Sequence, residues 1–385
     1  MDTLTKAEQM KKSDLDNTFR LQCMDLKTLS IIQFDRSVQS VAQLLKKTDP
    51  LKINRIVASG CGDSFLAAAE AKDCFARYLP EVRYEAYPGI EAGRYTNYSD
   101  NEDRTLVIAI SNSGGPARIA EILARANRYG CISVALTDHP ESRAAKTAQF
   151  TYHTNTPAGD NVSGLRTYYA SMISMYVLAA ALAEKRLSKP CLEEMRTHIA
   201  VYFETFYSRI QEIDDAAFET ALAWKDKKVF EVTADGPLFS CGKFIAAKMA
   251  ELSGDACSVI DSENYCHVNG LMYPGKDIGE MVLIDSGAKN LDHIADTVNI
   301  QVKTGGREVL VFCDREPDKI GITETVRYCP LPMPEQNWSF LAPLLSYVPG
   351  GLFAGYRAKE LNEPFFRGGS FFEKMTLGTN PIRIV

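Results

Sequence analysis

Apolar residues along the chain fall into short runs that alternate with amphipathic stretches. In the first half, strands are predicted at 54–59, 82–87, 105–110 and 131–137. Helices are predicted at 63–79 and 116–129. Pro116 and Gly130 flank the second of these, which is typical of helix ends. Aliphatic strands that alternate with helices indicate a parallel sheet covered on both faces.

The same order of elements recurs in the second half. Strands are predicted at 227–234, 280–285 and 308–314, and helices at 240–252 and 291–306. Ala58 and Ala234 are 176 positions apart, and so are Asp138 and Asp314. Further helices are expected within 1–48 and around 165–185 and 190–215. The pattern predicts two α/β domains of one type that arose by duplication.

Composition narrows the class of protein. The 385 residues are 45% hydrophobic and 24% charged, which suits two folded domains. The net charge of -6, with no run of Lys or Arg, argues against a nucleic-acid partner. The polar N-terminus is not a signal peptide, and the apolar run 170–183 is too short to span a membrane. We expect a soluble, cytoplasmic protein that does not act at a membrane.

Cysteine and histidine spacing excludes two further classes of site. The ten cysteines are scattered without a CxxC pair, as in reduced intracellular proteins. The five histidines lack HxxxH or HExxH spacing. No metal site is therefore predicted.

Two polar turns follow predicted strands in the first half. These are SGCGDS at 59–64 and SNSGG at 111–115, each just before a helix. Ligands of parallel sheets bind at this edge, where helix amides and serine hydroxyls favour a phosphate group. The second half has ADGPLFS and DSGAKN in these places, with few hydroxyls. The sequence thus predicts a phosphate site in the first half.

Two other interpretations of these turns stay open. Serine and asparagine at helix starts often do no more than cap the helix. GCGDSF also resembles the start of a dinucleotide-binding GxGxxG motif, with Glu85 as the acidic residue further on. Phe65 replaces the third glycine of that motif, and the SNSGG turn would then have no role.

Three segments resemble the sugar isomerase (SIS) domain family in its double-domain form: SGCGDSFLAAAEAK, AISNSGGPARIAEILARANRYGCISVALTD and DNVSGLRTYYAS. The chain is similar to the isomerase half of glucosamine-6-phosphate synthases and closer to fructoselysine-6-phosphate deglycases. The resemblance implies two tandem SIS-type three-layer α/β/α domains with parallel sheets, flavodoxin- or Rossmann-like. The expected parts are an N-terminal helical segment (1–34), a phosphosugar-binding SIS domain (35–200), a second SIS domain (201–345) and a C-terminal tail (346–385).

The resemblance also implies site residues. It assigns the sugar phosphate to Gly62, Ser64, Ser111, Asn112, Ser113, Ser163 and Arg166. Relatives use a catalytic glutamate and a histidine 16 positions later, which here are Glu251 and His267. A carboxylate suits proton removal next to a carbonyl, and imidazole suits ring opening.

Features of this chain leave those roles open. Glu251 could pair with Lys248 one helical turn back, and His267 could be an ordinary loop histidine. Pro116 stands where the family usually has a threonine, so one phosphate-binding hydroxyl is lost. The chain reads CHVNG where relatives often have His-Gly-Pro.

The predicted reaction is deglycation of a 6-phosphorylated ketosamine to an aldose 6-phosphate and an amine or amino acid, without a cofactor. The alternatives are an aldose–ketose isomerase, an amino-sugar phosphate deaminase, or a non-catalytic phosphosugar sensor. Glucosamine synthesis is disfavoured because the chain begins at the isomerase-like region and its tail, MTLGTNPIRIV, has no lysine. A homodimer or larger homo-oligomer is expected, with His267 acting in a neighbouring subunit.

Overall fold

The computed structural model of the chain describes residues 17–99, 104–159 and 164–369. These residues form two compact units. The N-terminal unit comprises the described part of Thr28–Ala200, and the C-terminal unit comprises the described parts of Met1–Lys27 and Val201–Glu373. Helices α2 (Thr18–Leu45) and α9 (Cys191–Ser208) contribute to both. The domain boundaries expected from the resemblance stay a prediction.

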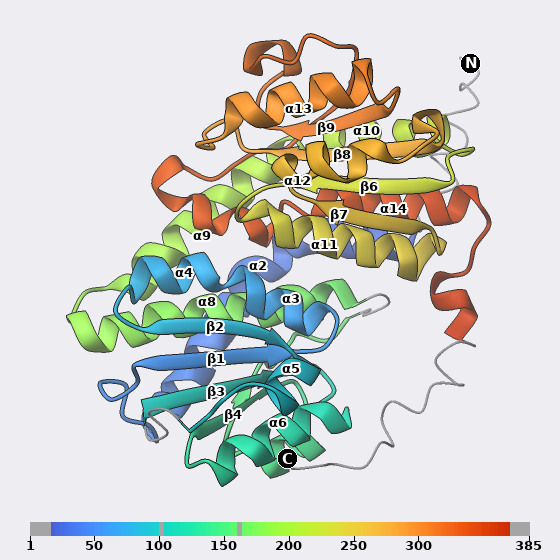
Figure 1. Ribbon diagram of the computed structural model, residues 1–385. Coiled ribbons are helices and arrows are strands. Elements are labelled where there is room, and N and C mark those ends of the chain that lie inside the picture. Colours follow the sequence, from blue (N-terminus) through green and yellow to red (C-terminus); the bar gives the residue numbers. More distant parts are fainter. Residues whose placement is uncertain (1–16, 100–103, 160–163, 370–385) are drawn as a thin grey trace, which may run out of the picture. The chain divides into compact units, whose positions relative to one another are not determined.

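The N-terminal unit is built on a parallel five-stranded sheet with the order β2-β1-β3-β4-β5. Its strands are β1 (Arg55–Gly60), β2 (Arg83–Pro88), β3 (Thr105–Ile110), β4 (Ile132–Thr137) and β5 (Phe150–His153). One face is covered by α3 (Asp63–Glu70), α4 (Lys72–Tyr78) and α8 (Leu165–Leu187), and the other by α5 (Gly89–Arg94), α6 (Ala117–Arg128) and α7 (Arg143–Thr147) (Figure 1).

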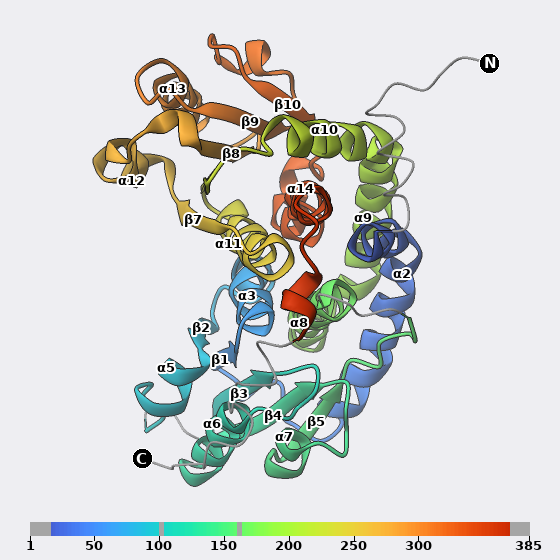
Figure 2. The ribbon, with the colours of Figure 1, turned by 90° about the vertical axis from the view of Figure 1, so that its right-hand side faces the viewer.

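The C-terminal unit repeats this plan with the order β10-β9-β8-β6-β7, again wholly parallel. Its strands are β6 (Val229–Ala234), β7 (Ala256–Ile260), β8 (Ile278–Ile284), β9 (Glu308–Cys313) and β10 (Arg327–Pro330). Helices α10 (Ile210–Ala223), α11 (Leu238–Lys248) and α14 (Val348–Glu360) cover one face, and α12 (Ser262–His267) and α13 (Leu291–Lys303) cover the other (Figure 2).

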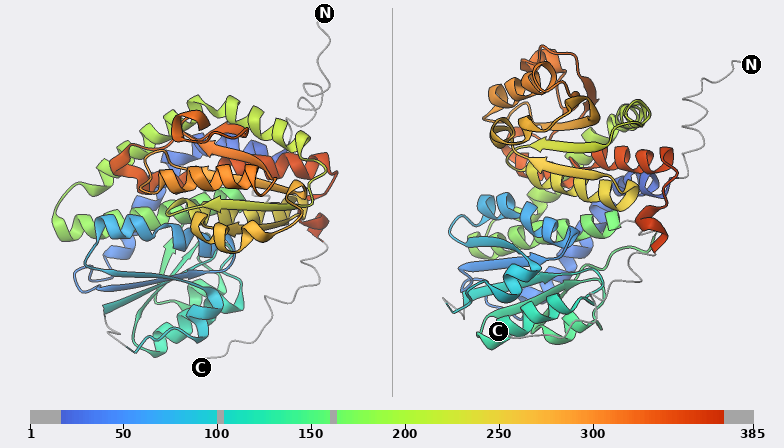
Figure 3. Two further views of the ribbon diagram at one scale, coloured as in Figure 1. Left: turned by 45° about the horizontal axis from the view of Figure 1, so that its top comes forward. Right: turned by 45° about the vertical axis from the view of Figure 1, so that its right-hand side comes forward.

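Short helical turns complete the C-terminal unit. They are the π-helical turn η3 (Met249–Ser253) and the 3-10 turns η4 (Asn269–Leu271), η5 (Gly275–Asp277), η6 (Pro317–Ile320), η7 (Gln336–Leu344) and η8 (Phe365–Gly369). Figure 3 shows the helices on both faces of each sheet from two further directions. The two sheets confirm the predicted α/β class and the repeated order of elements.

In each sheet, successive strands are first added on one side of the first strand and then on its other side. From β1 the chain crosses to β2 at one side, and from β2 it returns past β1 to β3. Right-handed crossovers in opposite directions place their helices on opposite faces, which explains why α3 and α5 lie on different faces. The same switch occurs between β6 and β8. Open sheets of this kind bind ligands at such switch points.

The apolar cores form where the aliphatic strands meet these helices. In the N-terminal unit Val107, Ile119 and Leu123 are fully buried in one cluster. In the C-terminal unit Val282 and Val298 are buried in the corresponding place. Within the described parts of the chain, no helix combines the length and the apolar character needed to cross a membrane.

The structure differs from the sequence-based prediction in several elements, among them three strands and two helices. Strands β5, β7 and β10 were not predicted. The helix predicted at 63–79 is broken at Ala71 into α3 and α4, and the one predicted at 240–252 changes from α-helix to π-helix at Met249. The C-terminal stretch contains α14, which packs against α10 and α11.

Candidate functional site

The two polar turns of the N-terminal unit begin side by side. Strands β1 and β3 are direct neighbours, with Ser59 opposite Ala109 in the parallel register. The turns that follow them, 59–64 and 111–115, therefore start at the same edge of the sheet. They also flank the switch point of this sheet, where a crevice is expected. The topology thus brings together the turns that the sequence singled out.

The first turn is tight and depends on glycine. Gly62 is the N-cap residue of α3 and has a φ of 56°, a conformation that favours glycine. At Gly60 a Cβ atom would lie only 2.5 Å from the carbonyl carbon of Ser64. Ser64 is half-buried, and its N–H donates to the Cys61 carbonyl at 3.3 Å. Ser59 is fully buried, and no described group pairs with its hydroxyl.

The second turn is held by its own serines. The Ser111 hydroxyl oxygen, which is buried, accepts the N–H of Gly114 at 3.1 Å. The exposed Ser113 hydroxyl oxygen accepts the N–H of Gly115 at 3.3 Å. A hydroxyl that accepts one hydrogen bond still has a proton to donate. Both serines can therefore shape the turn and also donate to an anion.

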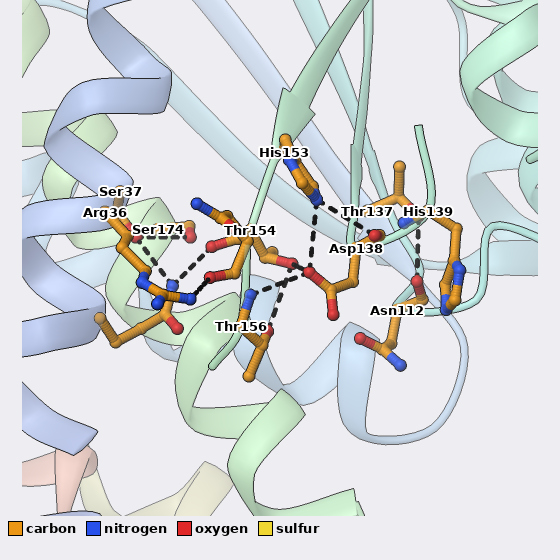
Figure 4. Close-up of polar contacts among 12 residues, drawn as sticks. Arg36, Ser37, Asn112, Thr137, Asp138, His139, His153, Thr154, Thr156 and Ser174 are labelled. Carbon is orange, nitrogen blue, oxygen red and sulfur yellow. Dashed lines mark hydrogen bonds and ion pairs between the residues drawn. The ribbon is translucent and has the colours of Figure 1, made fainter. Parts of the chain in front are cut away.

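Strand β4 fixes this second turn from behind (Figure 4). The carbonyl oxygen of Asn112 accepts the Thr137 hydroxyl at 3.0 Å and the Asp138 N–H at 3.1 Å. Oδ1 of Asp138 accepts the Thr154 hydroxyl at 3.0 Å and the Thr156 N–H at 2.9 Å. The backbone of Asn112 is therefore anchored, whereas its side-chain amide takes no part in these hydrogen bonds.

Asp138 was not among the site residues predicted from the sequence. His153 also contacts Asp138: its Nε2 lies 3.5 Å from Oδ1 and 3.1 Å from the carbonyl oxygen of Asp138. The available signal was position alone: an acidic residue directly after a buried strand, at the edge where the polar turns lie. Asp138 supports the turn through the backbone of Asn112.

The alternative dinucleotide interpretation finds no support in the position of Glu85. Its carboxylate lies 2.6 Å from Nε of Arg55 and accepts the Tyr87 hydroxyl at 2.6 Å. The contact with Arg55 ties strand β2 to strand β1, so Glu85 has a role within the sheet.

Two further binding residues were predicted, Ser163 and Arg166, and α8 begins at Leu165. Ser163 is outside the described residues. Arg166 is buried in the first turn of the helix, and its Nη2 donates to the carbonyl oxygens of Pro157 and Ala158 at 3.0 and 3.3 Å. Burial lowers the pKa of the Arg166 guanidinium. The contacts found for Arg166 thus hold the preceding loop.

Glu251 lies in the C-terminal unit, within the π-helical turn η3. Its Oε2 is 2.5 Å from Nζ of Lys248. The Lys248 side chain is completely buried, and that of Glu251 is 30% exposed. Nζ of Lys248 also lies 4.7 Å from the ring centre of Phe244. The pairing considered as an alternative from the sequence is therefore present, and it fixes where the carboxylate lies.

His267 is at the end of α12 and is exposed. Its Nε2 lies 2.9 Å from Oε1 of Glu263, whose other oxygen is 3.3 Å from Nε2 of His293. Helices α11 and α12 cover opposite faces of the sheet (Figure 2). The structure therefore does not bring Glu251 and His267 together within the C-terminal unit.

The amino-acid sequence is similar to a known domain family and to several proteins of known function. The SIS domain model matches residues 51–181, the segment that contains both polar turns. Glutamine–fructose-6-phosphate aminotransferase (isomerizing) of Thermococcus kodakarensis is 25% identical over 335 residues, which are 83% of this chain and 51% of that protein. The chain spans about half the length of the curated relatives it matches.

Solved structures show the same fold. The C-terminal domain of glucosamine-fructose-6-phosphate aminotransferase from Francisella tularensis has a TM-score of 0.79 at 15% identity, covering 91% of this chain and 97% of that one. Tagatose-6-phosphate ketose/aldose isomerase from Escherichia coli has a TM-score of 0.70 at 15% identity, with coverages of 91% and 95%. Residues 51–181 thus match the SIS domain family, and the chain has the fold of these two solved structures.

Proposed function

We propose that the chain is an enzyme that binds a phosphorylated sugar at the two polar turns of its N-terminal unit. The observation that supports this most is the position of the turns side by side at the switch point of a SIS domain. The phosphate would accept from Ser64, Ser111 and Ser113, from the Asn112 side chain, and from amides near Gly62. The names of the relatives, which act on fructose 6-phosphate, favour a sugar phosphate.

The proposed substrate is a 6-phosphorylated ketosamine, with Glu251 as the catalytic base. Glu251 would remove a proton from C1 to give an enaminol, and a proton returned at C2 would give an imine. Water then adds to the imine, and the carbon–nitrogen bond breaks. The products are an aldose 6-phosphate and an amine or amino acid, so no oxidant or cofactor is needed.

We further propose that His267 acts in the site of a second copy of the chain. Glu251 and His267 lie on opposite faces of one sheet, so they cannot meet within their own unit. The segment after His267 exposes apolar side chains, with Leu271 83% and Tyr273 93% accessible to solvent. Contact with another subunit would remove this surface from water.

An aldose–ketose isomerase is the second candidate. It would use the same phosphate site and the same base, but both substrate and product would be sugar phosphates without nitrogen. The similarity of fold to a ketose/aldose isomerase favours this candidate. A deaminase or a non-catalytic sensor would bind the same phosphate.

To test this, the full chain is incubated with fructosamine 6-phosphates that carry different amines on C1, and the release of glucose 6-phosphate is assayed. Fructose 6-phosphate is tested in parallel. Release of glucose 6-phosphate only from the ketosamines supports deglycation, whereas its formation from fructose 6-phosphate supports the isomerase.

Two variants complete this experiment. Glu251→Gln should abolish turnover while sugar-phosphate binding persists. Glu219→Gln, which alters an exposed carboxylate on α10 away from Glu251 and His267, is the matched control. Activity that survives in Glu251→Gln would show that this carboxylate is not the base.

A further inference from the structure

The C-terminal unit has its own cavity at the corresponding switch point, between the ends of β6 and β8. The cavity has a volume of about 310 Å³, which is at the lower end of the range for small-molecule sites. Leu238, Leu283 and Ile294 line it and are buried. Duplication has thus produced a second crevice, but with different chemistry from the serine-rich turns.

Charges of both signs line the same cavity. Asp285 is half-buried, and its Oδ1 accepts the N–H of Gly287 at 2.8 Å. No described residue donates a hydrogen bond to its Oδ2. Burial and the nearby Asp314 raise the pKa of Asp285, so a cation at this carboxylate would relieve an unfavourable charge. Lys289 is exposed, and none of the described acidic residues pairs with it.

The helices that start at the cavity favour a negative group. Neither α11 nor α13 has a side-chain hydrogen bond at its N-cap residue. The N–H groups of Leu238 and Phe239 at the start of α11 donate to the carbonyl oxygens of Asp235 and Gly236, so at this helix only the dipole acts on a ligand. The dipoles of both helices favour an anion at the helix start. Asp235 does not supply it, because its two oxygens accept the Ser262 N–H at 3.0 Å and the Asn290 amide at 2.8 Å.

An apolar interior with a carboxylate and an ammonium group at its edge suits a ligand that has an apolar body and both charges. We propose that this cavity binds a small aliphatic amino acid. Its ammonium group would lie at Asp285, its carboxylate at Lys289 and the uncapped helix starts, and its side chain against Leu283 and Ile294. An amino acid is also a product class of the reaction proposed above. This binding site does not depend on that reaction, because it lies wholly in the C-terminal unit.

The test uses three probes with the same apolar body: L-norvaline, n-butylammonium, which lacks the carboxylate, and pentanoate, which lacks the amine. Calorimetric titration of the full chain should show norvaline binding at least about ten-fold more tightly than either single-charge probe, since each charged hydrogen bond contributes about 1.5 kcal/mol or more. Equal affinities, or no binding by any probe, would overturn the proposal.

Variants assign each charge to its partner. Asp285→Asn should weaken the binding of norvaline and of n-butylammonium about ten-fold and leave the binding of pentanoate unchanged. Lys289→Gln should weaken the binding of pentanoate about ten-fold and leave the binding of n-butylammonium unchanged. Ser339→Leu, which fills the cavity, should abolish binding of all three. Asp318→Asn, at an exposed residue outside the cavity, is the control. If Asp285→Asn binds norvaline as Asp318→Asn does, the site is excluded; thermal unfolding checks that each variant is folded.

Discussion

Gly114 is the residue of the SNSGG turn at which a single methyl group should do most harm. Its φ is 58°, where alanine costs about 1–2 kcal/mol. An added Cβ would lie 2.0 Å from Oγ and 2.5 Å from Cβ of Ser142. Forcing an atom into a packed place costs about 1–3 kcal/mol more. We therefore expect Gly114→Ala to lower the free energy of unfolding by about 2–5 kcal/mol.

Gly306→Ala is the matched control because it separates the two costs. Its φ of 62° is nearly the same, but an added Cβ would meet no atom within 4 Å. It should lose only about 1–2 kcal/mol. Urea unfolding followed by circular dichroism measures both variants. Equal losses would refute the steric argument.

The same substitution tests the link from the turn to binding. The Ser142 hydroxyl oxygen accepts the N–H of Ala145 at the start of α7, so Ser142 cannot move without loss of that bond. The turn must therefore shift instead, and affinity for fructose 6-phosphate should fall about ten-fold or more. Ser142→Gly in the Gly114→Ala background should restore much of the affinity. Unchanged affinity in Gly114→Ala would show that the turn does not bind the phosphate.

Three further predictions follow from other parts of the structure. Burial beside Glu231 raises the pKa of Glu280 to about 8 from 4.5, so the folded chain keeps a proton there that the unfolded chain loses. Stability should therefore fall as pH rises from about 4.5 to 8, by an amount on the order of a few kcal/mol, and Glu280→Gln should remove this part of the slope in urea unfolding at pH 5 and pH 8. Asp138→Ala keeps the backbone N–H that donates to Asn112 but removes the carboxylate that accepts from Thr154 and Thr156 and so positions that N–H. It should therefore weaken sugar-phosphate binding about ten-fold in calorimetric titration, whereas Asp138→Asn, which keeps an accepting oxygen, should lose less. Mixed dimers of Glu251→Gln and His267→Ala subunits should recover about a quarter of wild-type activity, because half of the dimers are mixed and each contains one intact site.

Each of these predictions has a contrary result. A pH slope that is the same in Glu280→Gln as in the wild type would show that Glu280 is ionised in the folded chain. Equal binding by Asp138→Ala and the wild type would show that the turn is stable without its support. Mixed dimers that remain inactive, although both parent proteins fold, would exclude a shared site.

Most of the strands that the sequence predicted lie inside their sheets and are buried on both faces. β1 and β3 are completely buried along their length, which requires the continuous aliphatic runs seen in the sequence. The three missed strands, β5, β7 and β10, are all at edges of their sheets. β2 is the fourth edge strand and is partly exposed, but the sequence did predict it. An edge strand is partly exposed, so its sequence needs no such run. Ala71, where the first predicted helix breaks, has no glycine or proline beside it that would indicate a break.

The candidate site was predictable to the extent that it depends on the ends of buried strands. Those strand ends placed the turns at 59–64 and 111–115 at one edge. The support from Asp138 requires the order of β3 and β4 in the sheet, which the sequence does not specify. The opposite faces of α11 and α12 follow from the crossover directions, and these require the missed strand β7.

The central claim is that the serines of the SNSGG turn bind the phosphate group of a sugar. Calorimetric titration with fructose 6-phosphate and with fructose tests it, comparing the wild type with the double variant Ser111→Ala, Ser113→Ala. Ser286→Ala, which alters the serine of the equivalent turn in the C-terminal unit, is the control. We predict that only fructose 6-phosphate binds and that the double variant loses about 100-fold in affinity while Ser286→Ala loses none. Binding of fructose 6-phosphate that is as tight in the double variant as in the wild type would contradict the claim.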